Sequence, residues 1–398
     1  LATMSIARRW GIADLVRRSA PLPLDFPSNV VYSTGVNGYE IARIANAFFT
    51  DPEGSALFPE PALRTTQPSF ERSLLEHLLT LPSVTVLRGA ELESFAEVDG
   101  GIRAEVRFPA TNQRKTYRAN FLAGCDGARS KVRESLAIEM NGEWGVARSV
   151  GAVFHAPQLE TMIPFGRAVH HWVIRDDIPV VAGMGPLDTR GQWFLQLMDL
   201  PAGMNVDAID MASFIRSCLG PDVPFDLQSV NPWSIHHLSA RKYRVGRAFI
   251  LGDAAHLHSP TGGFGLNTGI GDAVDLGWKL AAVLRGWGYD ALLDTFETER
   301  RPIHDYVMKL SIDNLGTQKF ADSITQQRLD EDVQLRKDFA AFIVETKTRH
   351  YRSIAAQLGT GYFGSPLVSA DEDRKGQPED PTRYVPSASP GSRAPHVW

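Results

Sequence analysis

The spacing of hydrophobic positions changes along the chain and predicts two kinds of structure. Apolar residues recur every three to four positions at 4–18, 68–79 and 266–284, a spacing that is typical of helices with one buried face. Between about 149 and 243, short runs such as 169–174 and 193–198 alternate apolar and polar residues, which indicates an antiparallel sheet with one helix at 207–219. We therefore predict an α/β protein in which a sheet-rich segment interrupts a helix-rich one.

Two short apolar runs end in a carboxylate. Residues 247–251 read as a buried strand closed by Gly252, and Asp253 follows it. Ligands of open parallel sheets sit beyond the carboxyl ends of the strands, so Asp253 is expected to face a crevice, where it can accept hydrogen bonds from a polyol. A second strand is expected to end at Asp126, before a helix that carries the cations Arg129, Lys131 and Arg133 near its start. Cations and free helix N–H groups together suit a phosphate.

The segment from Ser259 to Gly265 is too rich in glycine and proline to form a helix or a strand. Bare backbone at Gly263 and Gly265 would allow a planar ligand to lie almost against the chain. The helix predicted to begin near Leu266 would direct free N–H groups and its positive dipole end at that ligand. The loop and the helix together predict a site for a flat group that carries negative charge.

Outside these motifs, three further strands are expected at 84–87, 92–98 and 102–108. The last two are joined at 99–101 by Asp-Gly-Gly, which predicts a hairpin. A literal GxGxxG occurs at Gly359, Gly361 and Gly364, but no strand precedes it and Ser-Pro follows it. We interpret it as a loop, because the dinucleotide motif requires a strand, a turn and a helix in that order.

The stretch GDAAHLHSPTGGFGLNTGIGDAVDLGWKLA, residues 252–281, resembles the second FAD-binding motif of the FAD-dependent aromatic hydroxylases of the phenol hydroxylase and para-hydroxybenzoate hydroxylase type. The segment FLAGCDGARSKVRESLAI, residues 121–138, is similar to the DG motif of the same family, and LLDTFETERRPIHD, residues 292–305, is similar to a third family segment. The resemblance implies a doubly wound, Rossmann-like FAD-binding domain. It also implies an inserted, mixed and mainly antiparallel substrate domain.

The resemblance also assigns roles to individual positions. It implies that Asp253 binds the ribityl chain, that Leu266 and Asn267 touch the pyrimidine edge of the flavin, and that Pro260 lies beside the reacting ring carbon. It places Gln67, at the start of a helix, against FAD, although an ordinary polar cap explains this residue equally well. The expected cofactor site therefore comprises these five residues with Gly263, Gly265 and the DG-motif residue Asp126, and Pro260 is the one catalytic candidate.

The function implied by the resemblance is hydroxylation of a phenolic or other aromatic substrate. NADH or NADPH would reduce FAD, molecular oxygen would add to the reduced flavin, and the flavin hydroperoxide would pass a hydroxyl group to the ring. Two alternatives stay open at this point. One is a related FAD-dependent epoxidase or oxidase, and the other is a flavin-free and catalytically silent fragment.

The family pattern divides the chain into five segments. Residues 1–148 are expected to form the first part of the FAD-binding domain, without the N-terminal βαβ unit that carries GxGxxG in the family. Residues 149–243 would form the substrate domain, 244–300 the second part of the FAD-binding domain, and 301–358 a helical segment. Residues 359–398 are rich in Gly, Pro, Ser and Asp and are expected to be an exposed linker and the start of a truncated C-terminal domain.

Composition narrows the remaining choices. The 398 residues carry a net charge of −5, which argues against a nucleic-acid partner. No apolar run reaches the roughly 18 residues of a membrane span, and two cysteines favour a reducing cytoplasm. The expected partners are an aromatic small molecule and oxygen, and the resemblance allows a homodimer.

Several polar residues have a plainer interpretation than catalysis. His256 and His258 lack further ligands at metal spacing, so no metal is expected. Asp272 and Asp275 are interpreted as first-turn charges that favour the helix dipole. Within the predicted sheet, alternate side chains could line a pocket, but we favour packing or surface positions for each of five residues: His170, His171, Trp172, Trp193 and Gln196. Neighbouring side chains of a strand face opposite ways, so the two histidines of this set cannot share one site.

Overall fold

The computed structural model describes residues 1–51, 55–322, 324–369 and 376–397. Its largest sheet has eight strands in the order β14-β11-β7-β10-β9-β8-β1-β2. All neighbouring pairs in it are antiparallel except β1 with β8, so the sheet is mixed and mainly antiparallel, as predicted. Its strands are β1 Val30–Ser33, β2 Glu40–Ile44, β7 Met140–His155, β8 His170–Val173, β9 Ala182–Pro186, β10 Gln192–Leu197, β11 Asp226–Ala240 and β14 His256–Leu257.

The hydrophobic core of this region lies against one face of the sheet. Alternate residues of β7, β9 and β10 pack there with α5, Leu159–Met162, and α6, Met211–Leu219. Helix α6 follows the short helix η1, Val206–Ala208, and Asp210 caps it by accepting the Ser213 N–H at 3.1 Å. Because β1 and β2 join the far edge, this sheet includes residues from well before position 149.

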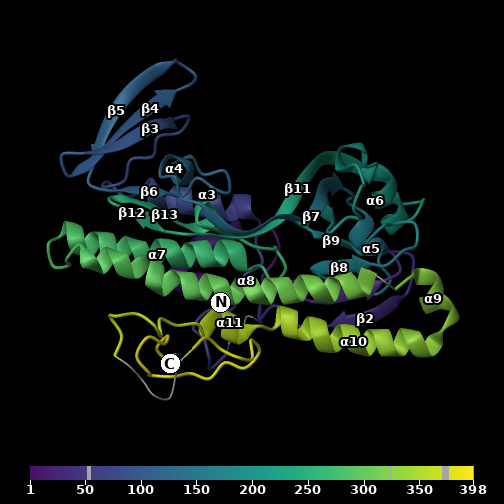
Figure 1. The fold of residues 1–398 in the computed structure, drawn as a ribbon. Coiled ribbons are helices and arrows are strands. Elements are labelled where there is room, and N and C mark those ends of the chain that lie inside the picture. The colour runs from purple at the N-terminus through teal and green to yellow at the C-terminus, as the bar shows by residue number, and fades with distance from the viewer. Residues whose placement is uncertain (52–54, 323, 370–375, 398) are drawn as a thin grey trace.

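A second sheet has three strands in the order β12-β13-β6, with bounds Arg244–Val245, Ala248–Ile250 and Leu122–Gly124. Strands β13 and β6 are parallel, and Ile250 lies opposite Gly124. The long helices α7, Phe264–Leu284, and α8, Ala291–Asp322, pack on each other beside this sheet (Figure 1). Strand β13 leads through η2, Gly252–Ala254, and β14 into α7. This sheet and these helices form the α/β half of the molecule.

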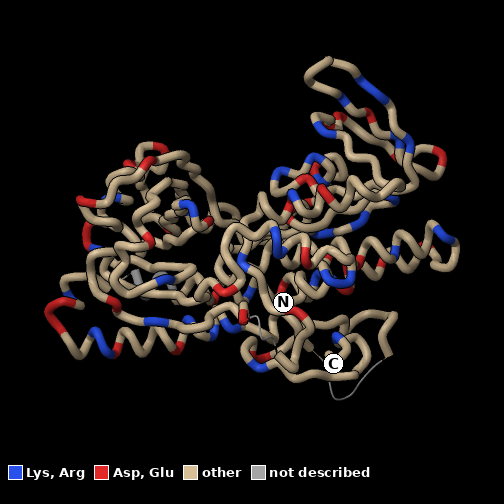
Figure 2. Tube along the Cα trace, turned by 180° about the vertical axis from the view of Figure 1, so that it is seen from behind, with Lys and Arg blue, Asp and Glu red and all other residues tan. Residues whose placement is uncertain are grey.

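The third sheet, β3-β4-β5, extends away from the rest of the molecule (Figure 1). The predicted hairpin is present between β3, Glu91–Val98, and β4, Gly101–Phe108, with positive φ at Asp99 and Gly100. Strand β5, Gln113–Ala119, was not predicted, because its side chains are exposed on both faces and show no alternation. Charges of both signs are interspersed along this sheet, as Figure 2 shows, and Arg114 pairs with Glu93 at 2.7 Å.

Two expected elements differ from the prediction. The helix predicted at 4–18 is divided into α1, Ala2–Arg9, and α2, Ala13–Ser19, because Gly11 takes φ +76° between them. Residues 84–87 form no strand; they stay exposed and pair with none of the described strands. Helix α3, Gln67–Leu78, begins where predicted, and α4, Lys131–Ser135, follows the DG motif.

The C-terminal part of the chain lies along α8. Helices α9, Gln326–Glu331, and α10, Val333–Tyr351, return the chain beneath the large sheet, and α11, Ile354–Leu358, follows (Figure 1). We expected an exposed linker beyond 358, but Ser365 is buried and donates to Glu299 at 2.5 Å. The acidic and basic run at 371–375 lies outside the described residues. The GxGxxG sequence at 359–364 is a loop, as predicted.

Candidate functional site

The two strand-end motifs lie side by side. Because β6 and β13 are parallel neighbours, Asp126 and Asp253 both follow the carboxyl end of this small sheet. The buried Arg133 joins the motifs, because its guanidinium donates to the carbonyl oxygens of Ala128 at 2.9 Å and Ala254 at 3.0 Å. The Arg133 guanidinium is therefore bound to backbone carbonyls inside the protein and is not placed to contact a phosphate.

Asp126 and Asp253 differ in their hydrogen bonding. The Asp126 carboxylate accepts from the Ser130 hydroxyl at 2.6 Å and from the Val132 N–H at 3.0 Å, so it orders the turn into α4. Asp253 makes no hydrogen bond or ion pair with the described residues. It keeps contact with solvent, yet the protein surrounds enough of it that partial burial raises the pKa of its carboxyl. Of the two strand-end carboxylates, Asp253 is therefore the one whose oxygens can accept hydrogen bonds from a ligand.

The glycine loop forms a tight, anchored turn before α7. Gly262 and Gly263 take φ +102° and +68°, a left-handed conformation that suits glycine. The Thr261 hydroxyl donates to the Ser311 carbonyl of α8 at 2.8 Å and fixes the loop from below. Helix α7 begins at Phe264, two residues before the predicted start, and the Asn267 amide donates to the Gly263 carbonyl at 2.7 Å. These contacts hold the loop backbone and the first turn of α7 in place and leave one side of them uncovered.

That side is a cavity of about 940 Å³ between the loop and the eight-stranded sheet. Five of the predicted site residues line it: Gln67, Pro260, Gly263, Leu266 and Asn267. The other three, Asp126, Asp253 and Gly265, lie outside its lining. We call the side formed by Pro260–Phe264 and the first turns of α7 the loop wall. Leu266 is 46% exposed there, which leaves an apolar side chain for a flat ligand to cover.

The opposite side of the cavity, the sheet wall, comes from alternate positions of two strands and from residues packed beside them. It comprises His170 and Trp172 of β8, Phe194 and Gln196 of β10, and Met198, together with Arg64, His350 and Tyr351. The assignment to packing or surface positions was therefore wrong for His170, Trp172 and Gln196. It holds for His171 and Trp193, whose rings lie 6.1 Å apart on the other face. The alternation of β8 separates the two histidines, as the sequence predicted.

The sheet wall contains buried nitrogen atoms without a described partner. His170 and His350 are 9% and 7% exposed, and His170 Nε2 and His350 Nδ1 make no hydrogen bond. Burial lowers the pKa of His170 well below its usual value and that of His350 to about 3, so both rings are neutral near pH 7. Trp172 Nε1 donates to the Tyr351 hydroxyl at 2.7 Å. No sequence pattern indicated Arg64, His350 or Tyr351, which reach the cavity from distant segments.

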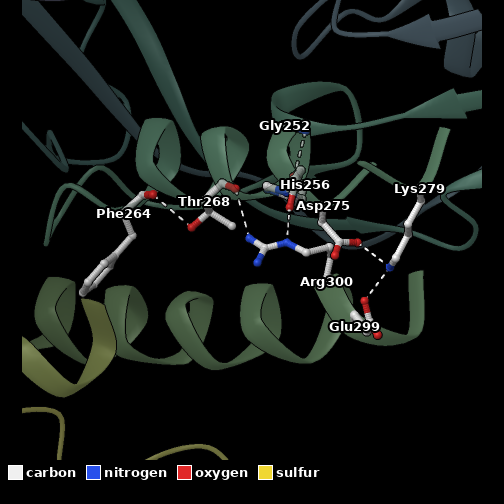
Figure 3. Close-up of polar contacts among 9 residues, drawn as sticks. Gly252, His256, Phe264, Thr268, Asp275, Lys279, Glu299 and Arg300 are labelled. Carbon is white, nitrogen blue, oxygen red and sulfur yellow. Dashed lines mark hydrogen bonds and ion pairs between the residues drawn. The ribbon is translucent and has the colours of Figure 1, made fainter. Parts of the chain in front are cut away.

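Beneath the loop wall, the charges are paired (Figure 3). Asp272 accepts from Arg300 Nε at 2.8 Å, from the Gly252 N–H at 3.1 Å and lies 2.6 Å from His256 Nε2. Burial opposes ionisation of Asp272, but the charges of His256 and Arg300 outweigh it and leave the pKa below its usual value. The Gly252 bond connects the strand end at Asp253 to α7.

A second buried group lies one turn further along α7. Lys279 Nζ donates to Asp275 at 2.6 Å and to Glu299, and Ser365 bonds the other oxygen of Glu299. Burial raises the pKa of Asp275 to about 6 despite the adjacent ammonium. The expectation that Asp272 and Asp275 are first-turn charges was wrong, because α7 begins at Phe264 and both lie in its buried interior. Residues of the 297–301 segment also form ion pairs: Glu299 with Lys279, Arg300 with Asp272, and Arg301 with Glu297.

His256, His258 and His304 form a buried ring cluster next to this network. The rings of His256 and His304 stack at 4.3 Å, and His258 lies 5.8 Å from His304. Burial lowers the pKa of His258 to about 4. Among the described residues, no group of three or more His, Cys, Asp or Glu is arranged so that it could hold a metal ion. In the same part of the chain, no helix combines the length and apolar character that a membrane crossing requires.

Residues 2–311 match the family model described as the FAD binding domain. The chain belongs to this family. A putative polyketide hydroxylase of Streptomyces halstedii is 30% identical over 404 residues, covering 100% of this chain and 68% of the relative. The tetracenomycin B2 monooxygenase-dioxygenase of Streptomyces olivaceus is 33% identical over 368 residues, covering 87% and 62%. The chain thus spans about two thirds of the length of these relatives.

A solved structure of the same architecture supports this assignment. The rebeccamycin biosynthetic enzyme RebC with reduced flavin superposes with a TM-score of 0.87 at 30% identity, covering 100% of this chain and 73% of that one. The fold class expected from the sequence and the resemblance to FAD-dependent aromatic hydroxylases are both confirmed. FAD is the cofactor of this family.

Proposed function

We propose that this chain is the flavin- and substrate-binding core of an FAD- and NAD(P)H-dependent monooxygenase that hydroxylates an aromatic substrate. The observation that carries the proposal is the cavity, because its two walls suit two flat molecules. An open glycine loop and a helix N-terminus face one side, and aromatic side chains face the other. Relatives of the chain are named as hydroxylases and monooxygenases.

The loop wall has the features that a flavin ring requires. The left-handed Gly262 and Gly263 keep side chains away from the cavity, and Leu266 offers an exposed apolar surface to the ring. The first N–H groups of α7 would stabilise negative charge at the pyrimidine edge of a bound flavin. Asp253 would accept hydrogen bonds from the ribityl hydroxyls, and Gln67 would contact the cofactor from the start of α3. Pro260 would lie beside the reacting part of the ring.

The remaining residues would bind the substrate and exclude water. Bound FAD would supply the redox and oxygen chemistry of the reaction. Trp172, Phe194 and Met198 would place an aromatic ring opposite the loop wall and keep the space between them poor in water. The proposed partners are therefore an aromatic small molecule, molecular oxygen and a nicotinamide reductant.

The test begins with the visible absorption spectrum of the purified chain after FAD is added and the excess removed. We expect a flavin band near unit stoichiometry, followed by NAD(P)H oxidation that depends on a phenolic substrate and yields a hydroxylated product. Peroxide alone as the product would indicate an oxidase, and an epoxide would indicate an epoxidase. A chain that binds no flavin would contradict the proposal for this chain.

Asp253→Ala tests the assigned cofactor site. Loss of a charge-assisted hydrogen bond should weaken FAD retention by about tenfold or more, measured by equilibrium dialysis. The control is Asp313→Ala, which removes an exposed carboxylate from α8 away from the cavity lining. Equal FAD affinity in the Asp253 variant, the control and the unmodified chain would count against the assignment.

A further inference from the structure

The cavity has an unusual charge balance. Among the described residues that line it are three arginines, Arg64, Arg300 and Arg393, and neither aspartate nor glutamate. Arg300 is neutralised by Asp272 beneath the loop wall. Arg393 belongs to the C-terminal segment that lies below α8. Arg64 is therefore the guanidinium of the sheet wall, and its charge has to be balanced by something other than a lining carboxylate.

Arg64 is held in place without an ion pair. Its guanidinium lies 5.9 Å from the ring centroid of Phe48, and it forms no hydrogen bond or salt bridge with any described residue. Glu60, four residues earlier, is already held by Arg8 and Arg17. An arginine stays charged at all ordinary pH values, and an inward-facing guanidinium without an anion lacks the compensation that such charges normally find. This arrangement leaves its five N–H donors for a ligand.

Two histidines converge on the same place from other elements. His170 comes from β8 and His350 from α10, and each presents a buried ring nitrogen without a described partner while lining the cavity. Electrostatic repulsion from Arg64 and His350 adds to burial in keeping His170 neutral. Buried polar atoms in folded proteins are nearly always satisfied, so clustered exceptions indicate a ligand that completes them. Arg64, His170 and His350 thus form one incomplete site.

We propose that this site, which we call the sheet-wall anion site, binds an aromatic substrate through a negatively charged group, a carboxylate or an ionised phenol. Arg64 pairs with the anionic oxygens, and the ring nitrogens of His170 and His350 supply further hydrogen bonds. The proposal rests on the proposed function, because it specifies the substrate class of that cavity. Arg64 acts as a specificity-determining residue.

The surroundings match the aromatic part of such a ligand. The rings of His170 and Trp172 lie 4.6 Å apart and those of His170 and Phe194 5.5 Å apart, so one aromatic surface adjoins the anion site. Gly183 of β9 lies behind this surface, and a Cβ atom there would come within 3.0 Å of both His170 Nε2 and Trp172. The glycine therefore preserves the space in which a flat ring can approach Arg64.

The test is isothermal titration calorimetry on the chain supplied with FAD, with 2-naphthoate and its neutral isostere 2-naphthamide as probes. We expect the unmodified chain to bind the acid more tightly than the amide. Arg64→Met should weaken binding of the acid by about tenfold or more and change binding of the amide by less than about threefold. Arg64→Lys should recover part of the preference, because it restores the charge without the bidentate geometry.

A matched control is Arg216→Met. Arg216 also stacks on a phenylalanine, at 5.2 Å from the Phe225 ring, but it lies on the exposed face of α6 and not in the cavity lining. It should leave both affinities unchanged. Titration of 2-naphthol above and below its own pKa separates the two sources of charge. Tighter binding of the ionised naphthol identifies a phenolate site, and preference for naphthoate alone identifies a carboxylate site.

The possible failures are distinguishable. Equal affinity for acid and amide, or an equal loss of both in Arg64→Met, would overturn the anion site even if FAD binds normally. Weaker binding of FAD or NADPH in this variant, with naphthoate unaffected, would assign Arg64 to the cofactors and also overturn it. Absence of flavin binding would contradict the proposed function, while the acid–amide comparison would still decide the site.

Discussion

The two walls of the cavity differ in whether their charged and titratable groups have partners within the protein. Beneath the loop wall, Asp272 and Lys279 each bond to two or more charged or polar groups. On the sheet wall, Arg64, His170 and His350 present donors or ring nitrogens without a described protein partner. Both regions are buried, so burial does not separate them. What separates them is whether the protein supplies a charged partner: each charged side chain of the network beneath the loop wall has one, although Asp275 Oδ1 accepts no hydrogen bond from the described residues.

This difference indicates where the molecule is scaffold and where it binds ligand. A network of paired charges holds its members in one geometry, and here it fixes the end of β13 and the first turns of α7 relative to α8. An incomplete set carries a cost that a ligand can remove. We therefore expect the loop wall to provide a preformed surface for the flavin. The unsatisfied groups of the sheet wall would determine which substrate binds.

The largest effect should come from removing the cation that two carboxylates of this network share. Lys279→Met leaves Asp275 and Glu299 buried without their shared cation, and it should lower the free energy of unfolding by about 3–5 kcal/mol in urea denaturation. Lys309→Met, at an exposed position of α8, should cost under about 0.5 kcal/mol. Arg64→Met should cost under about 1 kcal/mol, since it removes no protein ion pair. If Arg64→Met lowered the free energy of unfolding as much as Lys279→Met, the proposed difference between the two walls would be wrong.

The pH dependence of stability should originate partly from the sheet wall. Burial lowers the pKa of His350 to about 3 in the folded chain, from 6.5 for a free histidine, so between these pH values the unfolded chain binds a proton that the folded chain does not. The stabilisation by neutral His350 is therefore complete above pH 6.5 and is lost as the pH falls below it. Between about pH 7 and about pH 5, this residue should lower the free energy of unfolding by about 2 kcal/mol.

His350→Gln should remove that contribution and flatten the curve of unfolding free energy against pH. The matched substitution is His77→Gln, which removes a partly exposed histidine of α3 instead of a buried one. Parallel curves for the unmodified chain and His350→Gln would show that His350 is not held neutral by burial.

The sequence predicted the loop wall far better than the sheet wall. The loop wall is contiguous in sequence, so its strand, glycine turn and helix could be recognised from residues 247–284 alone. The sheet wall is assembled from β8, β10, α10 and the segment before α3. Its members meet only through tertiary packing, such as the bond between Trp172 and Tyr351, which are 179 residues apart. Alternation in β8 indicated which residues share a face, but not that the face lines a cavity.

Local sequence patterns also gave wrong predictions where a neighbouring strand or side chain determines the structure. Residues 84–87 alternate like a strand but pair with none of the described strands, whereas the polar β5 became a strand because β4 lies beside it. Asp272 and Asp275 could be buried in the interior of α7 because cations pair with them there, Arg300 of α8 with Asp272 and Lys279 of the same helix with Asp275. Propensity describes a segment alone, and these outcomes depended on its neighbours.

The smallest change tests the space between the walls. Gly183→Ala places a methyl group within 3.0 Å of His170 Nε2 and Trp172 and 3.3 Å of Gln196, so the sheet wall has to move into the cavity. Binding of 2-naphthoate and 2-naphthamide should weaken alike, by about tenfold, while FAD retention stays unchanged. Gly151→Ala on β7 is the matched control, because its methyl group would meet only ordinary contacts at 3.8 and 3.9 Å. Loss of FAD with unchanged naphthoate binding would reverse the roles assigned to the two walls.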